Sequence, residues 1–360
     1  MPFLNLSLTN FRNLQNETMD TFAKEVFFVG QNGQGKSNLL EALYYVSYAS
    51  SFRTRSESEI VRYNEKEFSV RTMFKDSNER TNIVGVFYQD SKKRIERNGK
   101  QVKDRKELVN TIPCVLFCHS DMDFVAGEPE RRRFFIDQSL TMHDAFYVDL
   151  MRRYKKLLKS RNTLLKEHNY GLLDVLDQQF AETGLEIQKK RKEVIHYFNV
   201  YFADFYSEIT GIDNVKIVYS PSWKVETAVE VQELLLQKRE SDKVLETTMS
   251  GPHRDQIRFV QNGKAFVPGA STGQRRMLSI LLRIMQALYY CAHTQKKPVL
   301  LMDDVLLELD PVKRQKVMNL LPEYDQLFCT FLPGEPYENY KKSGTKIFEI
   351  ENGIWNVKSD

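Results

Sequence analysis

Apolar residues follow two different patterns along this chain. Up to about residue 125 and again after Gly211, short runs typical of β-strands alternate with turns. Three of these turns contain Asn-Gly, a favoured hairpin pair, at residues 98–99, 262–263 and 352–353. Between about 130 and 210, apolar residues instead recur at three- and four-residue steps, for example at Val194, Phe198, Phe202 and Phe205. The pattern predicts an α/β fold that is interrupted by a helical insertion.

The segment at residues 30–37, GQNGQGKS, fits the phosphate-loop pattern G-x-x-x-x-G-K-[ST]. A strand-like apolar run precedes it and the helix-like sequence NLLEALYYV follows, and this is the context that the pattern requires. Its glycines allow positive φ angles, so that successive N–H groups surround an anion at a helix N-terminus. A glycine-rich turn without a ligand is the alternative. We predict a nucleoside triphosphate site formed by Gly30, Gln31, Asn32, Gly33, Gln34, Gly35, Lys36, Ser37 and Asn38.

Two side chains of this loop have separate expected tasks. Lys36 would neutralise the β- and γ-phosphates, and the Ser37 hydroxyl is a ligand suited to Mg²⁺. Far along the chain, residues 299–302 form an apolar run that suits a strand buried on both faces and that ends in Asp303 and Asp304. Because ligands bind at the carboxyl ends of parallel strands, these carboxylates are expected at the same site.

A second candidate anion-binding element precedes this strand. Residues 269–274, GASTGQ, form a polar turn before the strongly apolar sequence RRMLSILLRIMQALYY. Taken alone, the turn is either an ordinary helix cap or an anion site. Its position between the phosphate loop and the strand that ends in Asp-Asp is similar to the order of motifs in ABC-type ATPase heads.

In ABC-type heads, the S-x-G-Q segment completes the ATP site of a second protomer. The resemblance therefore implies that Asp304 orients or activates the attacking water, and that Asp310, in Glu308-Leu309-Asp310, lies in a loop that crosses the dimer interface. Three sets of site residues follow from it, namely nucleotide-binding Ser271, Gly273 and Gln274, metal-binding Ser37 and Asp303, and catalytic Lys36 and Asp304.

Further motifs make the resemblance more specific. LTNFRN before the phosphate loop, SFRT after it, ERRRF at 130–134, SGPHRD at 250–255 and DDVLLELD at 303–310 together resemble the RecF family of DNA replication and repair proteins, relatives of the Rad50 and SMC heads. Ala270 and Leu307 depart from the family pattern. The resemblance implies an ABC-type P-loop ATPase head with mixed β-sheets, at residues 1–128 and 246–360, and a mainly helical insertion domain at residues 129–245.

The function that this resemblance implies is control of DNA binding by ATP. RecF-like proteins bind ATP with Mg²⁺, dimerise on it, and bind double- and single-stranded DNA at gaps and junctions. They hydrolyse ATP slowly, which resets DNA binding, and help to load RecA together with RecR and RecO. We therefore expect a weak, DNA-dependent ATPase that forms a homodimer on ATP.

Two smaller polar groups have open interpretations. Phe52, Arg53 and Arg55 follow the phosphate-loop helix and could serve a phosphate or a base. In the SGPHRD segment, His253 and Arg254 are donors for a nucleotide or DNA phosphate, and the alternative is a surface turn stabilised by an Arg254–Asp255 pair.

Composition limits the partners. The net charge of +4 over 360 residues is too small by itself to prove a polyanion partner, but basic runs gather in the helical part, which is either a nucleic-acid footprint or a set of solvated faces. The runs are Arg131 to Arg133, Arg152 to Arg161 and Lys189 to Lys192. No stretch of 18 apolar residues and no signal-like start are present, so we expect a cytoplasmic protein without a membrane partner. The cysteine pair Cys114 and Cys118 suits a core strand better than a metal site, because no second ligand pair has suitable spacing.

Three other classes of ATPase compete with this interpretation. A transporter ATPase subunit would carry a switch histidine, but no histidine follows the strand-like run at 326–330, where Thr330 could take that place. An SMC-like structural protein needs longer coiled-coil arms than an insert of this size provides. A nuclease of the OLD kind needs a further cluster of metal-binding carboxylates, for which the chain after residue 330 is too short.

Overall fold

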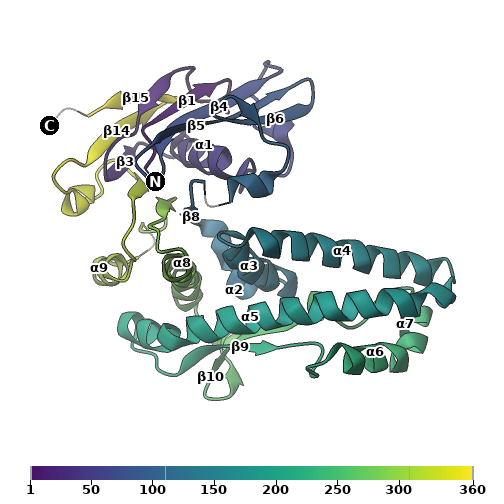
Figure 1. The fold of residues 1–360 in the computed structure, drawn as a ribbon. Helices are drawn as coiled ribbons and strands as arrows, with labels where there is room; N and C mark the ends of the chain where they lie inside the picture. The colour runs from purple at the N-terminus through teal and green to yellow at the C-terminus, as the bar shows by residue number, and fades with distance from the viewer. Residues whose placement is uncertain (1, 110, 308, 359–360) are drawn as a thin grey trace. The chain divides into compact units, whose positions relative to one another are not determined.

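The computed structural model describes residues 2–109, 111–307 and 309–358. The chain divides into two compact units (Figure 1). Unit 1 comprises Met1–Asp121 and Gln286–Asp360, and unit 2 comprises Met122–Met285. These limits differ from the predicted domains, because residues 246–285 fall within unit 2. The reason is that β10 (Gln256–Gln261) pairs with β9 (Val215–Ser220) along its whole length.

Unit 1 contains a six-stranded sheet with the strand order β15-β14-β3-β13-β12-β8, parallel except for the edge strand β15. Every residue of β3, β8, β12 and β13 is buried, as expected for strands covered on both faces. The two buried strands predicted beside the site are thereby confirmed. The strands are β3 (Glu25–Val29), β8 (Cys114–Phe117), β12 (Val299–Met302), β13 (Gln326–Phe331), β14 (Lys346–Glu351) and β15 (Ile354–Val357).

The second sheet of unit 1 is antiparallel, with the strand order β2-β1-β4-β5-β6-β7. Its strands are β1 (Asn5–Thr9), β2 (Thr18–Asp20), β4 (Phe68–Lys75), β5 (Thr81–Gln89), β6 (Lys92–Arg97) and β7 (Lys100–Gln101). The Asn98-Gly99 turn joins β6 to β7 with φ angles of 50° and 76°, the pair of positive values that a type I′ turn requires. The other two Asn-Gly pairs also form turns between antiparallel strands, so all three hairpin predictions are confirmed.

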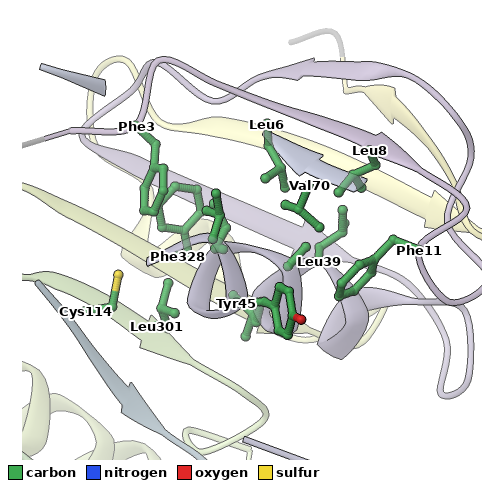
Figure 2. Close-up of a cluster of buried hydrophobic side chains, with 14 of the residues drawn as sticks. Phe3, Leu6, Leu8, Phe11, Leu39, Tyr45, Val70, Cys114, Leu301 and Phe328 are labelled. Atoms are coloured by element: carbon green, nitrogen blue, oxygen red, sulfur yellow. The ribbon is translucent and has the colours of Figure 1, made fainter. Parts of the chain in front are cut away.

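One hydrophobic core joins both sheets of unit 1 to helix α1 (Lys36–Tyr48). Figure 2 shows Leu39 and Tyr45 of α1 among side chains of the two sheets, including Leu6, Val70, Leu301 and Phe328. Cys114 is a buried residue of β8 in the same core, which confirms the core-strand interpretation of Cys114. The helix that carries the phosphate loop is held in place by this core.

A buried glutamine links the N-terminal strand region to the parallel sheet. Gln326, at the start of β13, is 1% exposed, and its side-chain oxygen accepts a hydrogen bond of 2.7 Å from the Phe3 N–H. Its amide nitrogen donates to the carbonyls of Phe3, Thr21 and Ala23 at 3.0, 3.0 and 2.9 Å. All of these groups lie where water does not replace a lost partner.

We expect Gln326→Leu to lower the free energy of unfolding by roughly 2–4 kcal/mol, because it leaves a buried N–H and several buried carbonyls without a hydrogen-bond partner. Urea denaturation followed by tryptophan fluorescence measures the change. Gln237→Leu, on an exposed position of unit 2, is the matched control and should shift stability by less than about 0.5 kcal/mol. Equal effects of the two substitutions would contradict the role of Gln326.

Unit 2 is mainly helical and carries a three-stranded antiparallel sheet, β11-β10-β9. The helical periodicity between 130 and 210 is confirmed as α3, α4 and α5, and α5 ends at Gly211, whose φ of 73° suits a glycine cap. Helix α8 begins in unit 2 and ends in unit 1, which also contains α9. The remaining bounds are α2 (Asp123–Ala126), α3 (Pro129–Thr141), α4 (Ala145–Lys166), α5 (Leu173–Thr210), α6 (Ala228–Gln237), α7 (Arg239–Leu245), β11 (Lys264–Ala265), α8 (Thr272–Thr294) and α9 (Pro311–Asn319).

The SGPHRD segment has an internal structural role. Asp255 is fully buried and accepts hydrogen bonds from Arg191 at 2.9 Å, Gln188 at 2.7 Å and Tyr219 at 2.5 Å. Arg191, on α5, also forms an ion pair of 2.9 Å with Asp137 on α3. The alternative of an Arg254–Asp255 pair is therefore wrong, because Asp255 faces inward to Arg191 while Arg254 is exposed.

His253 of the same segment also has internal partners on both ring nitrogens. Its Nε2 lies 3.0 Å from the Thr248 carbonyl, to which it must donate, and its Nδ1 therefore accepts the hydrogen bond of 2.7 Å from the Tyr154 hydroxyl. Burial lowers the pKa of His253 to about 4, and neighbouring arginine charges act in the same direction. The ring is held neutral inside unit 2.

The low pKa of His253 predicts a loss of stability in acid. The unfolded histidine titrates near 6.5, so between about pH 6.5 and 4 the unfolded state binds more protons, and stability falls as pH falls through this window. The contribution lost is about 3 kcal/mol. We expect His253→Gln to reduce the difference in unfolding free energy between pH 7 and pH 4.5, whereas His196→Gln, on the exposed side of α5, should keep it. The same pH dependence in both variants would rule out His253 as its origin.

Candidate nucleotide-binding site

The phosphate-loop segment connects β3 to the N-terminus of α1. Gly33 and Gly35 have φ angles of 81° and 116°, a region that favours glycine, and α1 begins directly after Gly35 without a side-chain cap. Gly30 is required for a different reason, since a Cβ atom there would lie 2.4 Å from the Ile350 carbonyl oxygen of β14. Positive-φ glycines directly before a helix N-terminus without a side-chain cap are an arrangement that can bind an anion, and the predicted phosphate contacts of this loop stay a prediction.

Three hydrogen bonds connect the loop and the start of α1 to neighbouring segments. The Gln34 side chain accepts a hydrogen bond of 2.5 Å from the Asn352 N–H, and its carbonyl accepts one of 2.9 Å from the Gly353 N–H, both in the β14–β15 turn. Asn38 donates at 2.7 Å to the side chain of Asn13. The side chains of Gln34 and Asn38 thus have partners within the protein, and the predicted contacts of these two residues with a nucleotide stay predictions.

Lys36 places a positive charge inside the loop. Its side chain is buried, and Nζ donates to the carbonyls of Gly30 at 2.8 Å and Gln31 at 3.1 Å. Among the residues that the structure describes, no carboxylate lies within ion-pair distance of this ammonium group. Burial lowers the pKa of Lys36, while the charges of Asp304 and Asp303 oppose that shift. A buried cation with only neutral partners is suited to an anionic ligand such as phosphate.

The structure brings Ser37 and Asp303 together, although 266 positions separate them in sequence. The Ser37 hydroxyl donates a hydrogen bond of 2.7 Å to Asp303 Oδ1, at the carboxyl end of β12. Burial raises the pKa of Asp303 to about 6, and the charge of Asp304 raises it further, whereas the bond from Ser37 lowers it. A hydroxyl and a carboxylate in contact are the oxygen donors that Mg²⁺ accepts, so the residues present fit this ion.

Asp304 is fixed by the neighbouring strand. Its φ of 53° is left-handed, its N–H donates to the Thr330 hydroxyl oxygen at 2.8 Å, and that hydroxyl lies 2.7 Å from Asp304 Oδ1. Thr330 belongs to β13, so this strand fixes the position of Asp304. That Thr330 takes the place of a switch histidine stays a prediction.

A buried carboxylate beside the loop was not anticipated from the sequence. Glu41 of α1 is fully buried and accepts hydrogen bonds from Arg12 at 2.8 and 3.0 Å and from Ser51 at 2.5 Å, with Arg53 at 3.5 Å. Arg53 also donates at 2.5 Å to Asn38, and its charge lowers the pKa of Asp303. Arg53 is thus held beside the phosphate loop. The available signal was a single acidic residue in the apolar sequence NLLEALYYV.

The second candidate element belongs to unit 2. Ser271 and Gln274 form a reciprocal cap at the start of α8, in which the Ser271 N–H donates to Gln274 Oε1 at 2.7 Å and the Gln274 N–H donates to Ser271 Oγ at 3.2 Å. Ser271 and Gly273 are exposed. The turn is therefore a helix cap whose outer side is accessible, and its predicted role in nucleotide binding stays a prediction.

The predicted interface loop is only partly described. Asp310 caps α9, with its side chain accepting from the Lys313 N–H at 2.9 Å, and it is exposed. Glu308 lies outside the described residues.

Known proteins are similar to this chain over nearly all of its length. The family described as the RecF/RecN/SMC N terminal domain matches residues 3–356. The DNA replication and repair protein RecF of Treponema pallidum (strain Nichols) is 47% identical over 350 residues, covering 97% of this chain and 99% of that protein. RecF of Leptospira interrogans (serovar Lai, strain 56601) is 32% identical over 356 residues, covering 97% of each.

Solved structures agree with the fold. The recombination mediator protein RecF-ATP of the RecFOR pathway superposes with a TM-score of 0.89 at 28% identity, covering 99% of this chain and 97% of that one. An SMC head bound to the C-terminal winged-helix domain of ScpA superposes with a TM-score of 0.57 at 15% identity, a likeness of fold alone. In the described part of the chain, no helix combines the length and hydropathy needed to cross a bilayer. The chain is a member of the RecF/RecN/SMC family, carries its ABC-type ATPase head fold, and belongs with the DNA replication and repair proteins named RecF.

Proposed function

We propose that this protein is an ATP-dependent DNA-binding protein of recombinational repair and replication, in which ATP drives dimerisation on gapped or junction DNA and slow hydrolysis reverses it. The observation that carries the proposal is the set of contacts at one edge of the parallel sheet, where Lys36, Ser37, Asp303 and Asp304 come from distant parts of the chain. The RecF relative at 47% identity and the RecF-ATP structure support it.

Each residue has a task in this proposal. The backbone N–H groups at the start of α1 and the Lys36 ammonium bind the phosphates, and Ser37 with Asp303 holds Mg²⁺. When bound, Mg²⁺ supplies positive charge that offsets the negative charge developing on the transferred phosphoryl group. Asp304, held by Thr330, orients the attacking water and accepts its proton. Arg53, held by Glu41 and Asn38, adds positive charge at the entrance.

Dimerisation couples the nucleotide to DNA in this proposal. The accessible turn at Ser271, Gly273 and Gln274 binds ATP held by a second protomer, so the dimer is favoured only while ATP is intact. DNA that prefers the dimer then raises the apparent affinity for ATP in return. We place this cycle in the cytoplasm, acting with RecR and RecO in the loading of RecA.

An SMC-like structural ATPase is the nearest alternative. The helices of unit 2 argue against it, because even α5, with 38 residues, is only about 57 Å long at a rise of 1.5 Å per residue. We therefore favour the proposed function over that of a structural ATPase with long coiled-coil arms.

We expect Lys36→Arg to retain part of the ATP binding but to lose hydrolysis by about 100-fold or more, since the larger, planar guanidinium does not reproduce a point charge inside the loop. Nucleotide binding is measured with a fluorescent ATP analogue and turnover by phosphate release. Lys93→Arg, a partly buried lysine paired with Glu57 away from the loop, is the control. Unchanged turnover in Lys36→Arg would exclude this loop as the catalytic site.

Sedimentation velocity with and without Mg-ATP, and with and without gapped duplex DNA, tests the proposed function directly. The protein should be monomeric alone, dimerise with Mg-ATP, and dimerise more strongly when DNA is present. Ser271→Arg should still bind ATP as a monomer but fail to dimerise, because a long charged side chain fills the turn. Ser241→Arg, exposed on α7, serves as the matched control. Dimerisation that ignores nucleotide, or that survives Ser271→Arg, would count against the proposal.

A further inference from the structure

Helix α4 carries an unusual density of positive charge. Residues 150–166 contain seven arginines and lysines and no aspartate or glutamate. One of the seven, Arg161, is fully buried and forms ion pairs with Asp177 and Asp242 at 2.7 and 2.6 Å, so it belongs to the interior of unit 2. The other six are exposed, namely Arg152, Arg153, Lys155, Lys156, Lys159 and Lys166.

Most of this exposed charge lies along one side of the helix. Arg152, Lys155, Lys159 and Lys166 follow each other at steps of three, four and seven residues, which places them in one row. From Arg152 to Lys166 the row is about 21 Å long at a rise of 1.5 Å per residue. A shallow depression of about 400 Å³ runs along it, lined by Lys155, Leu158, Lys159, Asn162, Thr163 and Lys166, without an acidic group.

The side chains of the lysines in this row form no polar contacts with the described residues. Among the described residues, no ion pair or hydrogen bond joins the side chain of Lys155, Lys159 or Lys166 to another group. Other basic groups of unit 2 have partners inside the protein. Arg191 forms ion pairs with Asp137 and Asp255, and Arg133 donates a hydrogen bond to the Asp255 carbonyl. The exposed Lys189 and Lys192 of α5 differ again, because Glu186 and Glu193 flank them in the helix.

Like charges at Lys155 and Lys159, four residues apart, destabilise a helix. Arg152 pairs with Asp149 at 3.5 Å, but Lys155, Lys159 and Lys166 have no ion-pair partner among the described residues. These three lysines therefore point to a ligand that supplies the missing negative charge. Among polyanions, DNA matches the length, since 21 Å corresponds to about six nucleotides at 3.4 Å each. Lysines are flexible point charges suited to phosphates, and they carry no geometry for reading bases.

We propose that the outer face of α4, formed by Arg152, Lys155, Lys159 and Lys166, binds the sugar-phosphate backbone of DNA without reading its sequence. The inference rests on the proposed function for its DNA ligand, and it assigns that ligand to one face of one helix. The basic runs at 131–133 and 189–192 have internal partners or acidic neighbours and play a smaller part.

The test measures DNA affinity of the full chain with Mg-ATP, by fluorescence anisotropy on gapped duplex DNA over a range of salt concentrations. The variant Lys155→Gln, Lys159→Gln, Lys166→Gln removes three charges at exposed positions that keep their helix propensity. We expect the slope of log affinity against log salt to become shallower by roughly 2.7, at about 0.9 per lost phosphate contact, and the affinity to fall roughly tenfold or more. Lys155→Arg, Lys159→Arg, Lys166→Arg keeps the charge and should keep the affinity.

A matched control separates the face from net charge. Lys189→Gln, Lys192→Gln, Lys216→Gln also removes three charges from exposed positions of unit 2 and should change the slope by less than about 1. Equal losses in the two triple variants would overturn the assignment to α4, as would an unchanged affinity of the α4 variant.

Two further outcomes are informative. If the α4 variant binds DNA normally but loses binding of polyglutamate that the original protein shows, the face serves an acidic protein segment and the proposal is wrong. If the original protein dimerises with ATP but does not bind DNA at all, the DNA-binding part of the proposed function fails, independently of the comparison between variants. Melting temperatures of all variants within about 2 °C of the original exclude unfolding as the cause.

Discussion

Parallel pairing of β3, β13 and β12 is the constraint on which the candidate site depends. The three strands are buried on both faces and pair in a fixed register, with Met302 opposite Cys329 and Phe28 opposite Thr330. Their carboxyl ends therefore meet at one edge, where the phosphate loop leaves β3 and the carboxylates follow β12. The core around α1 holds the other end of the loop, since the helix is enclosed by side chains of both sheets (Figure 2). The loop geometry thus depends on the hydrophobic core of unit 1.

The charges at this edge are arranged for partners from outside the chain. Lys36 is buried with carbonyl oxygens only, and Asp303 has a pKa raised to about 6 because it is buried beside Asp304. Both groups are costly as they stand: one is an ammonium in a site of low polarity, and the other is a carboxylate close to a second carboxylate. Phosphate oxygens and a divalent cation would offset both costs together. The electrostatics of this edge therefore agree with the proposed binding of a metal ion together with the nucleotide.

Arginine and lysine are used differently in unit 2. Arg161 and Arg191 lie in the interior, where each planar guanidinium pairs with two carboxylates from separate elements. Buried pairs of this kind tie α3, α4, α5, α7 and the SGPHRD turn together. The lysines of α4 point away from this interior, as their exposure shows. The interior arginines fix the shape of unit 2, and the outer lysines give one of its faces a charge.

The sequence by itself determined the elements whose signal is local. The phosphate loop, the two buried strands beside it, the Asn-Gly hairpins and the helical middle of the chain follow from the spacing of glycines and apolar residues within a few positions. It could not determine which charged groups meet, because those contacts join positions up to hundreds of residues apart. The pairing of Asp255 with Arg191 instead of Arg254, the internal role of His253, and the gathering of Arg12 and Arg53 around Glu41 were decided by folding. The sequence states which side chains carry a charge. Whether a charged side chain pairs inside the protein or is accessible to a ligand depends on its burial, which only the tertiary structure sets.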